Sequence, residues 1–223
     1  MATWKIRDLR EKLAGTLPKE DFEQARRLLA SLEWKIRAEK YHVRIAEQAF
    51  QEHFGDSEIS PDKAIGLALT DNEDGAKFAY SQSVREFNLV AAVAASHTTP
   101  ELFSQLIAML FVPEKIDVHA LTIKKVLSRL PDGDLKPKIQ EITQSSEYDY
   151  FRAFTNMSKH ISQVIPEYHV SFEVGEYHGV RFKEFEYKGI AYPAKRDEEL
   201  LKDLRIMRER LVYLGVLINA LVC

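Results

Sequence analysis

The sequence predicts a mainly α-helical protein: an up-down helical bundle with a small three-stranded antiparallel β-meander inserted before the C-terminal helix. Apolar residues recur with helical spacing over most of the chain, and the period changes from 3.6 to 2 only after Pro166. The closing stretch 197–222 gives the clearest helical signal, because its apolar residues alternate in steps of four and three. These residues are Leu200, Leu204, Met207, Leu211, Leu214, Ile218 and Leu221.

Composition is typical of a globular protein and excludes several classes. The 223 residues carry 31 basic and 34 acidic side chains, a net charge of −3, which argues against a surface that is basic throughout. Cys223 is the only cysteine, so there is no intrachain disulfide partner and no multi-cysteine zinc site. The charged N-terminus and the lack of about 18 consecutive apolar residues predict a cytoplasmic protein that does not span a membrane.

The N-terminal part of the chain predicts two helices. A short charged helix over 4–13 stops near Gly15, and Pro18 then begins a stretch to Phe54 without any helix breaker. Apolar residues recur every seven positions in this stretch, which predicts a long helix with a coiled-coil-like seam. At about 1.5 Å per residue it would span roughly 55 Å, so we expect either a kink or a projecting end that contributes to a homodimer.

The middle of the chain predicts further helices. Pro61 restarts helical sequence, and a helix that begins at 71–74 runs to His97. Thr99-Pro100-Glu101 is typical of a helix start, with a capping threonine, a first-turn proline and an acid, so His97 is expected at an elbow between two helices. Another helix is expected over 115–130, and Asp134 can cap a short one that ends near Ser145.

The β-meander is expected over 166–193. Tyr168, Val170, Phe172 and Val174 alternate with polar residues, and 175–179 make a turn. A change of phase in the return strand predicts a bulge at 183–184, and a third strand over 190–192 follows. No repeat or linker is evident, so we expect one domain: N-terminal helices (1–60), bundle core (61–165), β-meander (166–193) and closing helix (194–223).

The strongest candidate site is the helix predicted over 148–164. On a helical wheel, one arc is apolar and the opposite arc is polar, with His160 between the two. The apolar arc is Tyr150, Phe154, Met157, Ile161 and Val164, and the polar arc is Arg152, Asn156, Lys159 and Gln163.

The chemistry of that helix suits a phosphodiester. Residues 152, 156 and 160 are four apart, so neighbouring side chains on this row can touch. Imidazole titrates near neutrality and can accept a proton from a ribose 2′-hydroxyl, while Lys159 or Arg152 could hold a phosphate and Asn156 could orient a base. Two plainer interpretations stand beside this one: a solvated polar face, and a histidine that only packs at the edge of the core.

A family resemblance points the same way. The residues Phe154, Asn156, Lys159 and His160 form an F-x-N-x-x-K-H motif that resembles the HEPN superfamily, and the similarity covers roughly residues 75–222. That resemblance implies a helical domain of bacterial defence or stress systems that binds RNA or a nucleotide, or that cleaves RNA without a metal. It also implies a second histidine region, here His97 with Glu101.

The chain departs from the family pattern at one position. HEPN ribonucleases carry an arginine separated from the catalytic histidine by four to six residues, and those positions here hold Ala153, Phe154 and Thr155. Arg152 lies one residue further back. No metal-ligand spacing, phosphate loop or dinucleotide fingerprint is present, so neither a metal nor another cofactor is expected. His97 could face His160 and complete the site with Glu101, or it could simply cap the preceding helix.

Two hypotheses follow from the sequence. In the first, the protein is a HEPN-like domain that binds or cleaves RNA, with His160 as general base, Lys159 and Arg152 at the phosphate, and Asn156 orienting. In the second, it is a non-catalytic dimeric scaffold, which the long helix predicted for 18–54 and the apolar stripe of the closing helix favour.

Overall fold

The computed structural model describes residues 3–55, 59–113, 121–172 and 177–222. The chain forms two compact units: Met1–Ala38, Ala95–Phe151 and Arg205–Cys223 (unit 1), and Glu39–Ala94 and Arg152–Leu204 (unit 2). The boundaries fall inside helices α2, α5, α8 and α9. The single domain expected from the sequence stays a prediction.

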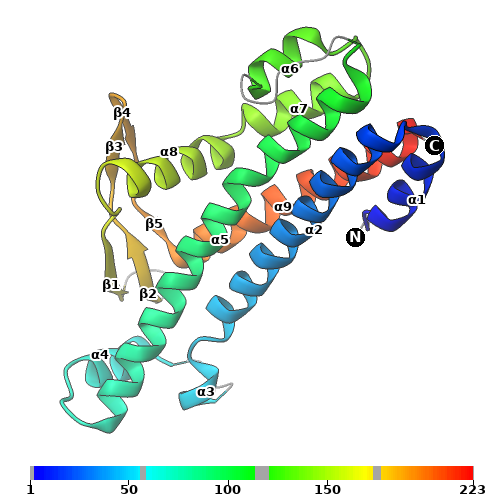
Figure 1. Ribbon diagram of the computed structural model, residues 1–223. Coiled ribbons are helices and arrows are strands. Elements are labelled where there is room, and N and C mark those ends of the chain that lie inside the picture. The colour runs from blue at the N-terminus through cyan, green and yellow to red at the C-terminus, as the bar shows by residue number, and fades with distance from the viewer. Residues whose placement is uncertain (1–2, 56–58, 114–120, 173–176, 223) are drawn as a thin grey trace. The chain divides into compact units, whose positions relative to one another are not determined.

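The mainly α fold with an antiparallel sheet before the last helix is confirmed (Figure 1). The helices are α1 (Ile6–Thr16), α2 (Lys19–Gln48), α3 (Gln51–Phe54), α4 (Pro61–Ala68), α5 (Glu73–Phe111), α6 (Ile123–Arg129), α7 (Leu135–Thr143), α8 (Ser146–His160) and α9 (Asp197–Val222). The strands are β1 (Pro166–Ser171), β2 (Tyr177–Phe182), β3 (Phe185–Tyr187), β4 (Ile190–Tyr192) and β5 (Lys195–Arg196).

In unit 1, Trp4 ties the start of the chain to the last helix. Its indole Nε1 donates to Asn219 Oδ1 at 2.9 Å, and the Asn219 amide returns a bond to the Lys5 carbonyl at 2.9 Å. The indole ring lies 5.1 Å from the ring of Phe103 on α5. Because the Trp4 side chain is buried and its N–H is satisfied, this contact joins apolar packing to a specific hydrogen bond.

The helix predicted for 18–54 is interrupted near its C-terminal end, in agreement with the kink that was one of the two expected outcomes. Helix α2 ends at Gln48, and the short α3 follows. No glycine or proline marks this end in the sequence. Instead, the Phe50 ring packs 5.5 Å and the Phe54 ring 6.0 Å from the buried Phe78, so tertiary packing of two aromatic rings in unit 2 accompanies the break.

The helix start predicted at Thr99-Pro100-Glu101 was wrong, because α5 runs unbroken through Pro100. Proline removes one amide donor from a helix and destabilises it, so a proline in the sequence is usually interpreted as a helix boundary. Here Thr99 is buried and its hydroxyl donates to the Ala95 carbonyl at 2.9 Å, as a residue inside a helix does, instead of capping a new one. His97 therefore lies inside a helix, neither at an elbow nor at a cap.

The helix predicted for 115–130 begins only at Ile123, where the Thr122 hydroxyl accepts the Lys125 amide at 3.3 Å and caps α6. Residues 114–120 lie outside the described part of the chain. Helix α7 starts after Asp134, as expected, but the Asp134 side chain makes no capping hydrogen bond to this helix.

The β-strands form two separate pairings in unit 2. Antiparallel β1, β2 and β5 make one sheet, in the order β1-β2-β5, and β3 pairs with β4 in a hairpin. Lys188 and Gly189 at the tip of this hairpin both have positive φ, of 54° and 76°, as two-residue hairpin turns require. The bulge predicted at 183–184 is instead the point where the chain leaves the sheet, and β5, not 190–192, supplies the third strand of the sheet.

A buried carboxylate lies beside the part of β2 that does not pair with β5. Asp197, the first residue of α9, accepts the Val180 amide at 3.1 Å and the Tyr177 hydroxyl at 2.8 Å. Gly179 leaves room for this arrangement, because a Cβ atom there would lie 2.5 Å from Asp197 Oδ2. Gly179 was expected in a turn and Val180 in a strand, whereas both lie in β2, and no sequence pattern indicates the carboxylate beside them.

Candidate functional site

Helix α8 carries the predicted site and is shorter than expected. It ends at His160, not near Val164. Its Phe154 ring lies 5.2 Å from Phe182 on β2 and 6.2 Å from Phe185 on β3, so the apolar side of α8 packs on the strands of unit 2. Ile161 was wrongly assigned to the core: it lies beyond the helix and is 65% exposed.

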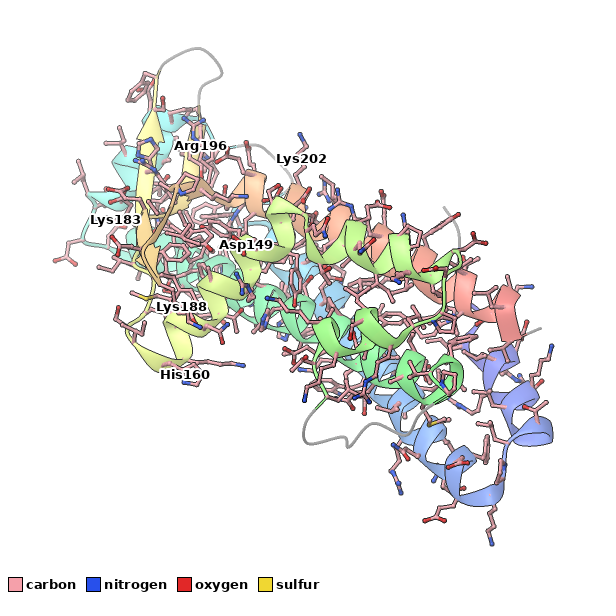
Figure 2. All side chains as sticks on the ribbon, turned by 90° about the horizontal axis from the view of Figure 1, so that it is seen from above. Asp149, His160, Lys183, Lys188, Arg196 and Lys202 are labelled. Atoms are coloured by element: carbon pink, nitrogen blue, oxygen red, sulfur yellow. The ribbon has the colours of Figure 1, made fainter. Side chains whose placement is uncertain are left out.

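The predicted polar row is present on α8. Arg152 and Asn156 are half-buried, whereas Lys159 and His160 in the last turn are exposed. Figure 2 shows His160 at the end of the helix. Since residues four apart on an α-helix are neighbours, the structure does bring Arg152, Asn156 and His160 onto one side of α8. Cations in a last turn also complement the helix dipole, which gives Lys159 and His160 a structural role independent of any ligand.

The polar row of α8 supplies hydrogen-bond donors and positive charge, but it does not hold the His160 ring in a fixed orientation for base catalysis. A histidine that acts as general base needs a neighbour that fixes its ring. Among the residues that the structure describes, none hydrogen-bonds to the His160 ring or forms an ion pair with Lys159. Both side chains are therefore available to a ligand, and a ligand would have to supply the orientation.

The second part of the predicted site lies in unit 1. His97 is buried, and its ring stacks on that of Tyr148 with 6.3 Å between centroids and 25° between planes. Glu101, one turn further along α5, is exposed. Burial and stacking assign His97 to the packing of unit 1, whereas Arg152, Asn156, Lys159 and His160 belong to unit 2.

A second charged group, which the sequence did not reveal, lies on the three-stranded sheet of unit 2. Glu167 on β1, Arg181 on β2 and Arg196 on β5 are register partners, so their side chains form a row across one face. Lys183 follows on the same side, because side chains two apart in an extended chain share a face. Figure 2 labels Lys183 and Arg196 at the sheet, apart from His160.

The contacts within this row are unequal. Glu167 serves two cations, with its oxygens 3.5 Å from Arg181 Nη1 and 3.1 Å from Lys183 Nζ. The Arg196 guanidinium instead lies over the Tyr177 ring, 4.6 Å from its centroid. The position of Arg196 beside Arg181 is known only from the register of β2 with β5. Strand β5 has two residues, so it has no periodicity from which this position could have been predicted.

Neither a metal centre nor a membrane segment emerges from the described residues. Within residues 3–55, 59–113, 121–172 and 177–222, no three His, Cys, Asp or Glu side chains gather as metal ligands would. Over the same residues, no helix combines the length and apolar character needed to cross a bilayer.

No family model, curated protein or solved structure matches this chain.

Proposed function

We propose that this protein is a HEPN-like RNA-binding protein that contacts single-stranded RNA through the polar row of α8. The observation that carries the proposal is the exposure of Lys159 and His160 side by side in the last turn, in line with Arg152 and Asn156. Lysine and arginine bind phosphate oxygens, and an amide or imidazole can hydrogen-bond a base edge. The F-x-N-x-x-K-H resemblance supports RNA as the ligand, and defence or stress as its setting.

The unoriented ring of His160 favours binding over cleavage. In the ribonuclease form of the proposal, RNA itself positions the imidazole, and His160 accepts the 2′-hydroxyl proton without a metal. Cleavage would then appear only with a bound substrate of suitable geometry, and binding would not depend on it.

Binding is tested by fluorescence anisotropy with a 5′-fluorescein-labelled single-stranded RNA of about twenty nucleotides, a length that covers more than one protein-binding site. Lys159→Gln/His160→Gln should weaken binding about tenfold, because two donors are lost from one phosphate-binding surface. Lys19→Gln, an exposed lysine at the start of α2, is the control and should bind as wild type does. Equal affinities for the double variant and wild type would overturn the assignment of α8.

Cleavage is tested separately, with the same RNA in the presence of EDTA. Loss of cleavage in His160→Ala with binding retained would support His160 as the base. Equal cleavage by His160→Ala and wild type would remove it from any catalytic role.

A dimeric scaffold is the second candidate, which one observation on α5 favours. Tyr80 and Phe87 are 57% and 65% exposed and stand seven residues apart, on one side of the helix. Large exposed aromatic side chains in a row are frequent at protein interfaces. Sedimentation equilibrium should show a wild-type dimer and a monomeric Phe87→Lys variant, and a monomeric wild type at high concentration would end this candidate.

A further inference from the structure

The sheet of unit 2 places two arginines directly opposite each other. Arg181 on β2 pairs in register with Arg196 on β5, and residues opposite each other in an antiparallel pair have Cβ atoms about 5 Å apart on one face. Like charges in this position repel, so such a pair destabilises a sheet unless a counter-charge lies nearby.

The carboxylates near this pair do not neutralise it. Glu167 is shared by Arg181 and Lys183. Asp197 lies 2.6 Å from Arg85 Nε and is fully buried, and Glu199 accepts only the backbone amide of Arg196, at 2.8 Å. Among the described residues, no carboxylate forms an ion pair with the Arg196 guanidinium.

Tyr177 holds the Arg196 guanidinium in place. The cation lies over the tyrosine ring, which is itself nearly buried and is fixed by its hydroxyl contact to Asp197. A guanidinium stacked on a ring keeps its in-plane N–H donors free, and this fork matches the oxygens of a phosphate group. Arg196 is therefore oriented for an anion before one arrives.

The row faces away from α8. Phe182, next to Arg181 on β2, packs on Phe154 of α8, and successive residues of a strand point to opposite faces. The arginine pair and the polar row of α8 consequently belong to different surfaces of unit 2.

We propose that this sheet face, formed by Arg181, Arg196 and Lys183, is a second phosphate-binding surface that holds the backbone of single-stranded RNA. Charge complementarity supports a phosphate ligand, because the row holds three cations and one carboxylate, and that carboxylate pairs only with Arg181 and Lys183. The choice of RNA as the source of the phosphates rests on the proposed function, whereas the phosphate site itself does not.

The first test measures RNA affinity against salt concentration for Arg181→Gln/Arg196→Gln. Each phosphate contact on a single strand contributes about 0.7 to the slope of log K against log salt, so the slope should fall by about 1.4 and the affinity about tenfold or more. Arg7→Gln/Arg37→Gln removes the same charge from side chains that are 86% and 72% exposed, and should leave the slope unchanged. Equal effects of the two double variants would overturn the site.

The second test uses inorganic phosphate alone. The arginine Nε–Hε signals of Arg181 and Arg196 in ¹⁵N-edited NMR spectra should shift with phosphate and not with chloride at equal ionic strength. Arg181→Lys/Arg196→Lys keeps the charge but loses the fork, so it should retain the salt slope and bind RNA several-fold more weakly. Unshifted Nε–Hε signals at saturating phosphate would overturn the site.

Combined outcomes separate this proposal from the one made for α8. Weaker RNA binding in Arg181→Gln/Arg196→Gln, with no effect of Lys159→Gln/His160→Gln, would retain the sheet site and remove α8. Phosphate-dependent shifts without any RNA binding would support the site and overturn RNA as its ligand. Wild-type binding to phosphatidylserine vesicles that Arg181→Gln/Arg196→Gln abolishes, with RNA binding intact, would likewise overturn the RNA assignment.

Discussion

Arg85 Nε lies 2.6 Å from Oδ2 of Asp197, whose side chain is fully buried. The carboxylate also receives the Tyr177 hydroxyl and the Val180 amide, so helix α5, strand β2 and the start of α9 meet at one charged group. Removal of one partner from a buried ion pair is costly, because the remaining charge stays desolvated without its counter-charge, at a cost of several kcal/mol.

Asp197→Asn should therefore destabilise the protein by roughly 3 kcal/mol, since it leaves the Arg85 guanidinium, 18% exposed, without its counter-charge. Urea unfolding followed by circular dichroism measures this loss. Asp132→Asn is the control: that carboxylate is 97% exposed beside Lys136, and its removal should cost less than about 0.5 kcal/mol. Similar losses in the two variants would show that the Arg85–Asp197 contact contributes little.

Tyr177→Phe should make stability less sensitive to alkaline pH. Burial raises the pKa of Tyr177 above its ordinary value of 10, and the nearby negative charge of Asp197 adds to the effect. The unfolded chain loses this proton near pH 10 while the folded protein keeps it, so stability is fully present below pH 10 and falls as pH rises further. The pKa of Tyr168 is raised for the same reasons, so part of the loss remains in the variant.

The variant also loses a buried hydrogen bond, which should cost about 1–3 kcal/mol at pH 7. Urea midpoints at pH 7 and pH 10.5 test both effects, with Tyr213→Phe, an exposed tyrosine, as the control. An equal alkaline loss in Tyr177→Phe and wild type would contradict the assignment to Tyr177.

Long periodic segments were predicted well from the sequence. Helix α9 was expected over 197–222 and runs over Asp197–Val222, because its apolar stripe repeats over about six turns. Short motifs gave wrong helix boundaries where tertiary packing determines the structure. Thr99-Pro100-Glu101 has the residues of a helix start, but α5 continues through the proline, and the buried Thr99 hydroxyl bonds back to the Ala95 carbonyl of the same helix.

The candidate sites show the same contrast between features that follow from a periodic pattern and features that depend on tertiary packing. The position of Arg152, Asn156 and His160 on one side of α8 follows from helical spacing alone, and their role as a site stays a prediction. The helix end at His160 was not, because no breaker precedes Pro166, and Ile161 was placed in the core for that reason. The pairing of Arg181 with Arg196 depends on a two-residue strand, which leaves no period in the sequence.

Gly215→Ala should destabilise unit 1. A Cβ atom at this position of α9 would overlap the Trp4 indole, which is fixed by its bond to Asn219. Overpacking of this kind costs typically about 1–3 kcal/mol. We expect a lower melting temperature and a red shift of the fluorescence of Trp4 as the ring moves.

Gly66→Ala is the matched control. Nothing lies within 4 Å of a Cβ atom there, and alanine in a helix is favoured over glycine by up to about 1 kcal/mol. Its melting temperature should be unchanged or higher. A fall as large as that of Gly215→Ala would mean that loss of glycine itself, and not contact with Trp4, is responsible.

Pro100→Ala should stabilise the protein by about 1 kcal/mol. Alanine restores the amide hydrogen bond to the Ser96 carbonyl and removes a helix-interior proline, a gain of about 3 kcal/mol, while two buried ring carbons are lost at about 0.8 kcal/mol each. Urea unfolding measures the net change in stability. Pro137→Ala is the control and should change stability far less, because Pro137 lies in the first turn of α7, where a backbone amide would have no acceptor within the helix. A marked loss of stability in Pro100→Ala would mean that the buried ring, and not the backbone, determines the residue at this position.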